Sequence, residues 1–373
     1  MEMNLLVIED DIEIVKKWQE TLEFYAIEDA PTYNINPTFS KTLDEAKSLI
    51  LHSYFDAIVI DIRLESEDAS PNKDGNEILK IVTSSTLSVA AVCTGEPSIV
   101  DLNLDHEESV KVFTKGTGNN ISQEIITWLD EKKSMISAIQ KMKESFKKEM
   151  ASIFFKSIWP RWSYWVDEGK SETSFTEKAL KRHMATHLHA SFLNLDNQSV
   201  HPEEYFFIPP LQERLDTGDI ILSEGKVEII VTPRCDMVRM KGTNPTYQLV
   251  TLLDKSEKWS ELERNLERAR TEGNTKKTDS IIKDIKKFTN HNNETTSHFI
   301  QKFRVKAADS WEDYGPYYAQ FNLIRSVSRG EETEKELLSK RIASLSNEFV
   351  PSLVERLGSF FSRIGTPDYS HPE

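Results

Sequence analysis

Cysteine is scarce in this sequence and forms no motif. Among the 373 residues there are two cysteines, Cys93 and Cys235, which lie far apart and outside any CxxC spacing. Disulfide frameworks and cysteine-rich zinc sites both need more cysteines at closer spacings. The scarcity argues against both and favours a reducing compartment, the cytoplasm.

Long apolar runs and an excess of positive charge are also missing. No run approaches the roughly 18 apolar residues that a membrane span needs, and the first apolar run ends at once in acids, unlike a secretory leader. The formal net charge is −15, from 46 Lys and Arg against 61 Asp and Glu residues. Because nonspecific nucleic-acid binding needs a positive field, this balance argues against such binding. We expect a soluble cytoplasmic protein without membrane association.

Residues 1–127 alternate short apolar runs with helical patterns. Strands are predicted at residues 4–8, 32–40, 55–62, 88–94 and 109–115. Helical spacing is found at residues 11–26, 42–54, 74–85 and 119–133. The run at 55–62 is apolar enough to be covered on both faces, as in a parallel sheet. Strands that alternate with helices in this way predict a doubly wound α/β domain with five parallel strands.

The helical pattern continues past residue 127 into an amphipathic linker helix over residues 128–157. Its apolar residues recur mostly three or four positions apart, with one interruption at Lys132, and the segment is locally basic. Two interpretations stay open. The helix could form a coiled coil with a second copy, which predicts a homodimer, or its apolar side could pack on the second domain.

Residues 158–373 differ in pattern from the first domain. Short strands punctuated by proline and glycine fall within residues 201–235 and predict a small β-barrel or meander. Residues 253–300 are charged and mostly helical, which predicts a helical insertion. We therefore expect the second domain to be of the α+β class.

Polar residues follow the strands predicted for the first domain. In chain order these residues are Glu9, Asp10, Asp11, Asp61, Thr94 and Lys115. Doubly wound sheets bind ligands at the carboxyl ends of their strands. Converging carboxylates need a hard cation to relieve their repulsion, and oxygen ligands suit Mg²⁺. A hydroxyl and an ammonium group that face the same point suit a phosphoryl group. The set predicts phosphoryl transfer onto a carboxylate.

The ordered segments "LLVIEDD", "AIVIDIRL", "DGNEIL", "AVCTG" and "VFTKG" resemble the receiver domain of bacterial two-component response regulators. The resemblance covers about a third of the chain, residues 1–127. It implies that Asp61 accepts the phosphoryl group. It also implies that Glu9, Asp10 and Asp61, with the backbone carbonyl of Arg63, hold Mg²⁺.

The same resemblance assigns the remaining strand-end residues and a partner. Thr94 matches the switch hydroxyl, and Lys115 matches the lysine that binds the phosphoryl group. Asp11 matches no metal ligand, and we expect it to be dispensable for the metal. A histidine kinase or phosphotransfer protein is the implied phosphoryl donor.

The sequence departs from the receiver pattern at several positions. Residues 65–73, which precede the Asp-Gly pair of the third helix, form an enlarged acidic loop beside the predicted site. Gly116 replaces the usual proline after the lysine. Val112 occupies the usual position of the aromatic switch residue, and Phe113 is one place off. We expect the relay outward from the switch hydroxyl to be rewired or weakened.

Three features of the second part of the chain could carry further chemistry. His183 and His187 lie four residues apart on a predicted helix, with His189 near, but surface or packing histidines are favoured because no HExxH glutamate is present. Cys235 beside Asp236 could be a nucleophile, but a buried structural cysteine is favoured. The aromatic cluster, which could stack bases or mark a packing seam, comprises Trp159, Trp162, Tyr164 and Trp165.

Residues 217–237 and 341–368 resemble uncharacterised output regions found with receiver domains in bacterial defence-type gene clusters. This resemblance implies a role in anti-phage defence and no known activity. The sequence thus favours a phosphorelay response regulator whose output domain binds a partner protein. The alternative is a receiver-gated hydrolase or nuclease that uses His183, His187, Cys235 and Asp236. A DNA-binding regulator is disfavoured by the charge and by the missing helix-turn-helix pattern.

Overall fold

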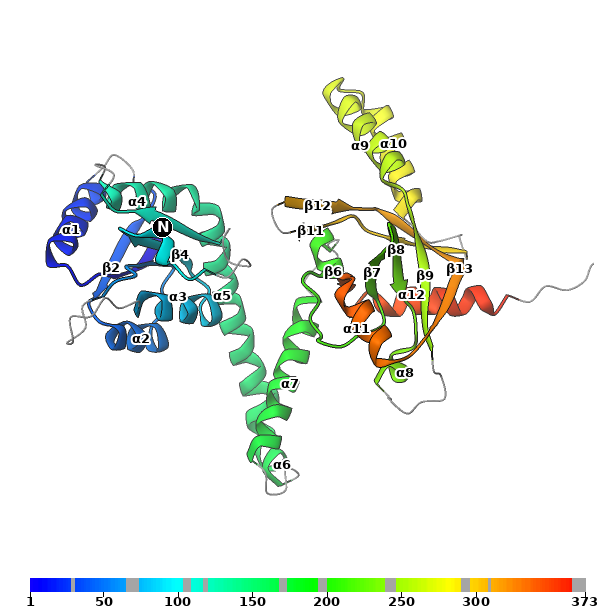
Figure 1. Cartoon of the computed structure of the whole chain (residues 1–373), viewed down its shortest axis with the longest axis horizontal. Coiled ribbons are helices and arrows are strands. Elements are labelled where there is room, and N and C mark those ends of the chain that lie inside the picture. The colour runs from blue at the N-terminus through cyan, green and yellow to red at the C-terminus, as the bar shows by residue number, and fades with distance from the viewer. Residues whose placement is uncertain are drawn as a thin grey trace, which may run out of the picture. The chain divides into compact units, whose positions relative to one another are not determined.

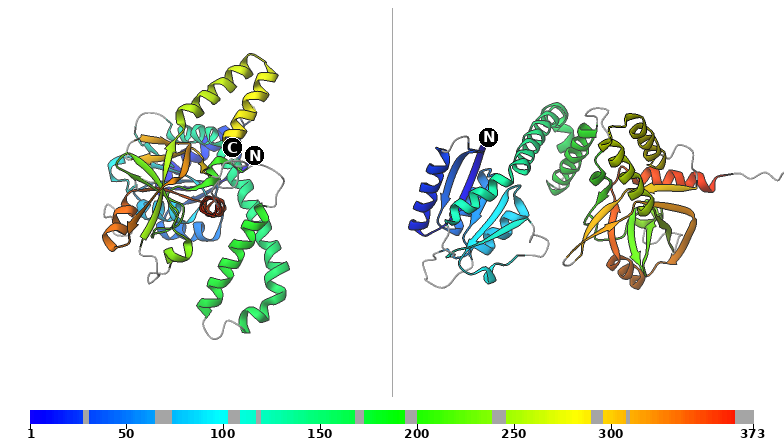
Figure 2. Two further views of the ribbon diagram at one scale, coloured as in Figure 1. Left: turned by 90° about the vertical axis from the view of Figure 1, so that its right-hand side faces the viewer. Right: turned by 90° about the horizontal axis from the view of Figure 1, so that it is seen from above.

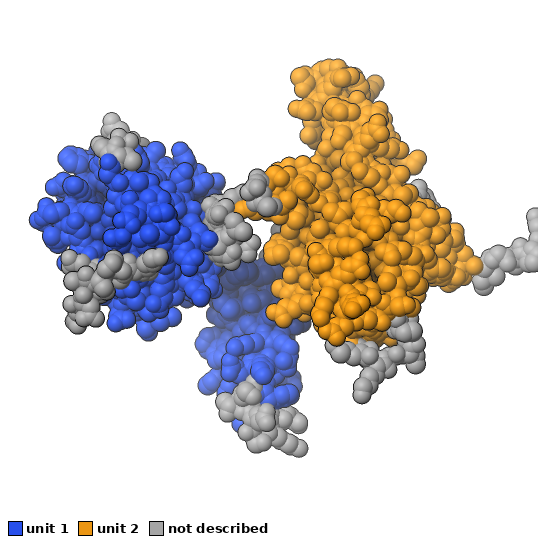
Figure 3. All heavy atoms as spheres, in the orientation of Figure 1, with its two compact units in different colours: residues 1–197 blue, residues 198–373 orange. Residues whose placement is uncertain are grey.

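The structure is a computed structural model that describes residues 1–27, 31–64, 74–102, 109–116, 120–167, 173–193, 200–238, 246–289, 296–307 and 310–363. The chain divides into two compact units, residues 1–197 and 198–373, which Figure 3 shows in blue and orange. Each unit has its own hydrophobic core and is described by itself. The predicted acidic loop at residues 65–73 lies outside the described residues.

The first unit contains a parallel sheet with the strand order β2-β1-β3-β4-β5. Its strands are β1 (Glu2–Ile8), β2 (Asn34–Ser40), β3 (Ala57–Ile60), β4 (Val89–Thr94) and β5 (Val110–Thr114). Ile8 pairs with Ile60, and Thr94 pairs with Thr114, so the carboxyl ends of these strands lie at one edge. This is the flavodoxin-like order also found in CheY. The predicted five-stranded, doubly wound α/β fold is confirmed.

Helices cover both faces of this sheet (Figure 1). They are α1 (Ile12–Ala26), α2 (Leu43–His52), α3 (Asp74–Ser85) and α4 (Ile121–Glu131). Trp18 of α1 and Ile125 of α4 belong to the core on one face, and Ile50 of α2 and Ile78 of α3 belong to the core on the other. Because successive strand residues point to opposite faces, each fully buried strand supplies both cores.

The connection from β4 to β5 differs from the other crossovers of the sheet. In its described part, residues 95–102 and 109, it contains a 3₁₀ turn at Pro97–Ile99 instead of an α-helix. The side chain of Asn76 holds this segment, because it donates to the carbonyl of Ile99 at 2.9 Å and accepts from the N–H of Asp101 at 2.9 Å. Ile99, Val100 and Leu102 pack against the core beneath α2 and α3. An irregular apolar segment thus covers the sheet here.

A pair of long helices follows the sheet within the first unit. Lys132, the interruption in the apolar series, separates α4 from α5 (Lys133–Ile153). A π turn, a 3₁₀ turn, α6 (Trp162–Asp167) and α7 (Thr173–Leu193) come next. Helix α7 packs along α5, with the rings of Phe146 and Phe192 5.1 Å apart (Figures 1 and 2). Part of the apolar side of α5 is therefore covered within the chain.

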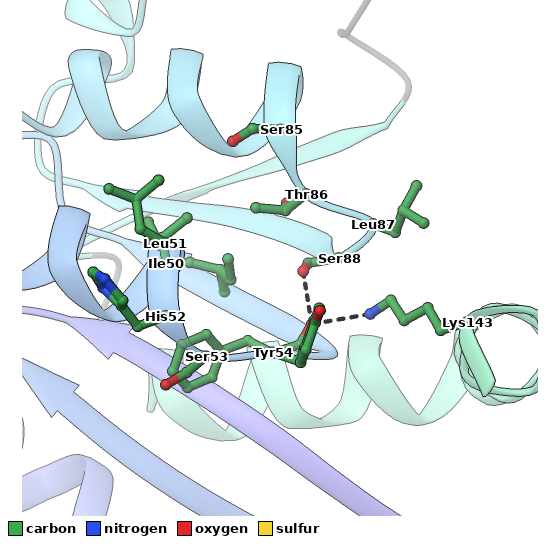
Figure 4. A pocket seen from close by; sticks show the side chains of 12 residues that line it. Ile50, Leu51, His52, Ser53, Tyr54, Ser85, Thr86, Leu87, Ser88 and Lys143 are labelled. Carbon is green, nitrogen blue, oxygen red and sulfur yellow. Dashed lines mark hydrogen bonds between the residues drawn. The ribbon is translucent and has the colours of Figure 1, made fainter. Parts of the chain in front are cut away.

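Helix α5 is attached to the amino-terminal edge of the sheet. Lys143 and Ser88 both donate to the carbonyl of Phe55, at 3.3 and 2.7 Å (Figure 4). Gln140 donates to the carbonyl of Glu2 at 2.9 Å. A pocket of about 330 Å³ lies beside Lys143 at this edge, opposite to the strand ends that carry the predicted site.

The second unit contains a seven-stranded sheet, ordered β10-β13-β9-β8-β7-β14-β6, and a hairpin of β11 and β12. The strands are β6 (Phe206–Phe207), β7 (Asp219–Ser223), β8 (Lys226–Ile230), β9 (Thr246–Asp254), β10 (Ser297–Ile300), β11 (Phe303–Ala307), β12 (Ser310–Tyr314), β13 (Tyr317–Ser328) and β14 (Arg341–Leu345). All its pairings are antiparallel. Strands β7, β8 and β9 form a meander, and the predicted α+β class is confirmed.

Five helices accompany the strands of the second unit in its described residues. They are α8 (Arg234–Val238), α9 (Ser256–Thr271), α10 (Thr275–Thr289), α11 (Glu331–Ser339) and α12 (Val350–Phe361). Helices α9 and α10 pack on each other and form the predicted helical insertion (Figure 1). Leu353 and Leu357 of α12 are buried in the main core of this unit. Across the described part of the chain, no helix is long and apolar enough to cross a membrane.

Candidate functional site

Four of the predicted residues lie where the strands of the first sheet end. Glu9 follows β1, Asp61 follows β3, Thr94 ends β4 and Lys115 follows β5. The backbone pairing continues past the strands, since the N–H of Asp61 donates to the carbonyl of Ile8 and the N–H of Lys115 donates to that of Thr94. These hydrogen bonds, of 2.9 and 2.8 Å, fix the backbone positions from which the side chains of Asp61 and Lys115 extend.

Lys115 connects the two buried carboxylates of this site. Its Nζ lies 2.7 Å from Oε2 of Glu9 and 2.8 Å from Oδ2 of Asp61. The side chains of Glu9 and Asp61 are 4% and 9% exposed, and that of Lys115 is 20% exposed. Two buried carboxylates repel each other unless a cation lies between them, and the ammonium group supplies that charge here.

The pKa values of Glu9 and Lys115 both reflect this close contact. Burial raises the pKa of Glu9 to about 7; the charge of Lys115 opposes this rise, and Asp61 adds to it. Burial alone would lower the pKa of Lys115, but the two carboxylates outweigh it and raise that pKa above its usual range. Lys115 therefore stays charged at neutral pH.

Glu9, Asp10 and Asp61 form a group of acids that fits a metal ion. Each has a carboxylate oxygen within 4.8 Å of the other two. Across the residues that the structure describes, no other cluster of three or more histidine, cysteine, aspartate or glutamate side chains comes this close. All three donors are hard oxygens. This donor set fits Mg²⁺ better than a softer metal.

Asp11, the third acid of the opening triplet, has a structural role. Its side chain accepts a hydrogen bond of 2.8 Å from the N–H of Glu13 and caps the start of α1. An N-cap carboxylate satisfies one of the free N–H groups of the first helical turn. The sequence predicted no metal contact for Asp11, but this helix cap was not predicted.

Arg63 and Glu96 link the connection after β3 to the connection after β4. The N–H of Arg63 lies 3.4 Å from Oδ1 of Asp61, and its guanidinium group lies 2.7 Å from Oε2 of Glu96. The N–H of Glu96 in turn donates to Oγ1 of the buried Thr94 at 3.2 Å. Glu96 was missed by the sequence analysis, and its position two residues after Thr94 was the available signal.

Gly75 holds α3 against the backbone of the site. A Cβ atom at this position would lie 2.1 Å from the carbonyl oxygen of Asp61 and 2.5 Å from Cα of Ile62. The N–H of Gly75 donates to the carbonyl of Ile62 at 3.1 Å. The glycine is therefore required by a close approach of two backbones. The Asp-Gly pair of the segment "DGNEIL", Asp74 and Gly75, was the sequence signal for this role.

Val112 and Phe113, at and next to the expected position of the aromatic switch residue, lie on opposite faces of the sheet. Phe113 is buried and packs edge-on against Trp128 of α4 at 5.8 Å. Val112 packs with the opposite core, beneath α2 and α3. Gly116 has a φ of +90°, which favours glycine after Lys115. The aromatic ring next to the site thus lies on the α1–α4 face of the sheet, not on the face that Val112 occupies.

The second set of predicted residues is divided between the two units. His183 and His187 are neighbours on α7, with ring centroids 4.2 Å apart, and belong to residues 1–197. Cys235 and Asp236 belong to residues 198–373, and Sγ of Cys235 lies 3.8 Å from Oδ1 of Asp236. The prediction of a buried Cys235 is wrong, because this cysteine is exposed on the short helix α8. Neither unit contains all four residues.

The predicted aromatic cluster lies around the turn between α5 and α7. Trp159, Trp162 and Tyr164 are exposed, and Trp165 contacts the ring of His183 at 5.0 Å. Arg161 lies over the ring of Tyr164. The observed partners of these rings belong to the helical pair of the first unit.

Comparisons with known proteins found matches among solved structures. No family model and no curated protein matches the chain. A CheY-like receiver domain from Methanospirillum hungatei JF-1 is 17% identical over 37% of this chain and 98% of its own, with a TM-score of 0.28. The Francisella response regulator 1452 receiver domain is 21% identical over 38% and 98%, with a TM-score of 0.26. The phosphorylated cyanobacterial phytochrome response regulator RcpA is 19% identical over 35% and 94%, with a TM-score of 0.25.

Proposed function

We propose that the chain is a response regulator that accepts a phosphoryl group on Asp61 in a phosphorelay. The observation that carries this proposal is the contact of Lys115 with both Glu9 and Asp61, at 2.7 and 2.8 Å, beside a third carboxylate from Asp10. Such a site combines a nucleophilic oxygen, a cation for the phosphoryl oxygens and acids for a hard metal.

Each residue has a distinct part in the proposed reaction. A carboxylate oxygen of Asp61 forms the new bond to phosphorus while the bond from phosphorus to the donor group breaks. Lys115 turns from the carboxylate of Asp61 to the transferred phosphoryl oxygens, and the hydroxyl of Thr94 meets the same group. Glu9, Asp10, Asp61 and the carbonyl of Arg63 would hold Mg²⁺, which neutralises the charge of the phosphoryl group when bound.

Incubation of the full chain with acetyl phosphate and Mg²⁺ tests the proposal. Intact-mass spectrometry should show one added phosphoryl group on the wild type and none on Asp61→Asn. Asp11→Asn is the matched control, since it changes a neighbouring acid that caps a helix and should be labelled like the wild type. Equal labelling of Asp61→Asn and the wild type would contradict the assignment.

The partners in this proposal follow from the same chemistry. A histidine kinase or phosphotransfer protein would supply the phosphoryl group in the cytoplasm. Homodimerisation through α5 stays part of the proposal: Met135, Met142 and Met150 keep exposed side chains on this helix. The second unit would bind a partner protein, in keeping with a role in bacterial anti-phage defence.

A further inference from the structure

The second unit contains a polar pocket that the proposed phosphoryl chemistry does not use. Its volume is about 240 Å³, and its lining includes Arg214, Asp216, Asp219, Arg234 and Asn347. Asp216 and Asp219 flank Gly218, which has a φ of +96°, in a turn that leads into β7. Acids and arginines so close together in a cavity mark a candidate binding site.

Asp219 organises the inner wall of this pocket and has little capacity left for a ligand. It is 1% exposed, and its carboxylate accepts from the N–H of Asp216 at 2.8 Å, the hydroxyl of Ser344 at 2.5 Å and the guanidinium of Arg341 at 3.1 Å. Arg341 also donates to the carbonyls of Gln212 and Arg214, at 2.6 and 2.8 Å. The buried pair therefore fixes the backbone that carries Arg214.

Two arginines at the mouth of the pocket share a single carboxylate. Nε of Arg234 lies 3.4 Å from Asp216, and Nη2 of Arg214 lies 3.9 Å from the same carboxylate. Arg234 also donates to Oδ1 of Asn347 at 2.7 Å. In the described part of the chain, the guanidinium of Arg214 has this long ion pair and no hydrogen bond. Its side chain is 44% exposed and presents unused donors.

The charges at the mouth do not cancel. Arg214 and Arg234 contribute two positive charges, and Asp216 contributes one negative charge, so one positive charge is left over at the mouth. Arginine forks match the oxygens of phosphate groups. Because the amide oxygen of Asn347 is taken by Arg234, its NH₂ group is left as a further donor at the rim.

We propose that this pocket binds a phosphoryl group, free or as a phosphomonoester, between Arg214 and Arg234. Asp219 and Arg341 are positioning residues, and Asp216 competes with the ligand for the two guanidinium groups. The site belongs to the second unit and does not depend on phosphorylation of the first.

Calorimetric titration of the full chain with inorganic phosphate, at low ionic strength and with EDTA to remove divalent metal, tests this site. Wild-type protein should bind phosphate with a dissociation constant of about 1 mM or below. Arg214→Gln and Arg234→Gln should each weaken binding about tenfold or more. Asp216→Asn should tighten binding, because the competing charge is removed. Arg304→Gln is the matched control, since this exposed arginine pairs with Asp313 elsewhere in the unit, and it should bind like the wild type.

Further titrants separate the sources of the phosphoryl group from other anions. Glycerol phosphate that binds at least as tightly as inorganic phosphate supports a phosphomonoester, and a preference for inorganic phosphate supports the free anion. Acetate that binds as tightly as phosphate would overturn the phosphoryl assignment. So would a failure to bind phosphate, unchanged affinity in both arginine variants, or weaker binding by Asp216→Asn. If an arginine variant fails to fold by circular dichroism, Arg214→Lys and Asp216→Asn decide the outcome.

Discussion

The ammonium nitrogen of Lys115 lies 2.8 Å from Oδ2 of Asp61, although the two residues are 54 positions apart in the chain. Both carboxylates that Lys115 contacts are almost fully buried. Removal of one partner leaves the other charges buried and uncompensated, which costs about 3–5 kcal/mol in buried pairs. Since Lys115 is 20% exposed, water can relieve part of this penalty.

Lys115→Met should therefore lower the free energy of unfolding of the first unit by about 3 kcal/mol, the lower end of that range. Urea denaturation followed by circular dichroism measures the loss. Lys111→Met, at an exposed position on the same strand β5, serves as the control and should change stability by less than about 0.5 kcal/mol. A loss of equal size in both variants would show that Lys115 does not hold the two carboxylates.

Variants of Asp10 and Asp11 should distinguish metal binding from helix capping. Asp11→Ala removes the N-cap of α1 and should cost about 1 kcal/mol of stability while leaving phosphorylation by acetyl phosphate unchanged. Asp10→Asn should instead cause a large loss of Mg²⁺-dependent labelling. The two variants need only thermal unfolding and intact-mass measurements. Loss of labelling in Asp11→Ala would place this acid in the site.

Gly75→Ala should destabilise the first unit by about 1–3 kcal/mol, because the new Cβ would lie 2.1 Å from the carbonyl oxygen of Asp61. Relaxation of this clash moves either α3 or the acceptor strand, so labelling of Asp61 should slow as well. Gly95→Ala is the control in the same unit, since nothing lies within 4 Å of its added Cβ. Denaturant unfolding and a labelling time course measure both effects. Equal behaviour of the two variants would contradict the packing role of Gly75.

The two cysteines should react at very different rates with a thiol reagent such as Ellman's reagent. Cys93 is 2% exposed, and burial raises the pKa of its thiol to about 12. Cys235 is exposed. Because the thiolate is the reactive form and must be reachable, native protein at pH 8 should show one fast thiol and a second only after unfolding. Cys235→Ser should abolish the fast phase, and two fast thiols in the native wild type would contradict the burial of Cys93.

The sheet and its site were predictable because both follow from rules that act along the sequence. Apolar runs identified the strands, and parallel strands place their carboxyl ends at one edge, which brings Glu9, Asp61 and Lys115 together. The connection from β4 to β5 was not predictable in this way, because Ile99, Val100 and Leu102 pack without a helical period.

Other features depend on tertiary packing, which local sequence patterns do not reveal. The exposure of Cys235 depends on how α8 lies on the second unit. The polar pocket joins Arg214, Arg234 and Asn347 from three distant segments, and none of these segments contains a motif. The face of the sheet on which Phe113 lies could have been predicted, because alternate residues of β5 point to opposite sides.

The pH dependence of stability should identify Glu9 as the unusual acid of the site. Burial raises its pKa from 4.5 to about 7, with Lys115 opposing and Asp61 adding to the rise. Between these two pH values the native state keeps a proton that the unfolded chain has released. The free energy of unfolding therefore falls as the pH rises from about 4.5 to about 7.

This dependence can be measured by urea denaturation in EDTA at several pH values between 4.5 and 8. Each pKa unit corresponds to about 1.4 kcal/mol, so the contribution of Glu9 is on the order of a few kcal/mol. Glu9→Gln cannot release the proton and should flatten the fall in stability across this window. Glu13→Gln replaces an exposed acid of α1 and should keep the wild-type slope. A parallel loss of stability in Glu9→Gln and the wild type between pH 4.5 and 7 would contradict this prediction. It would mean that Glu9 is already ionised in the native state, because the contact with Lys115 at 2.7 Å offsets the effect of burial on its pKa.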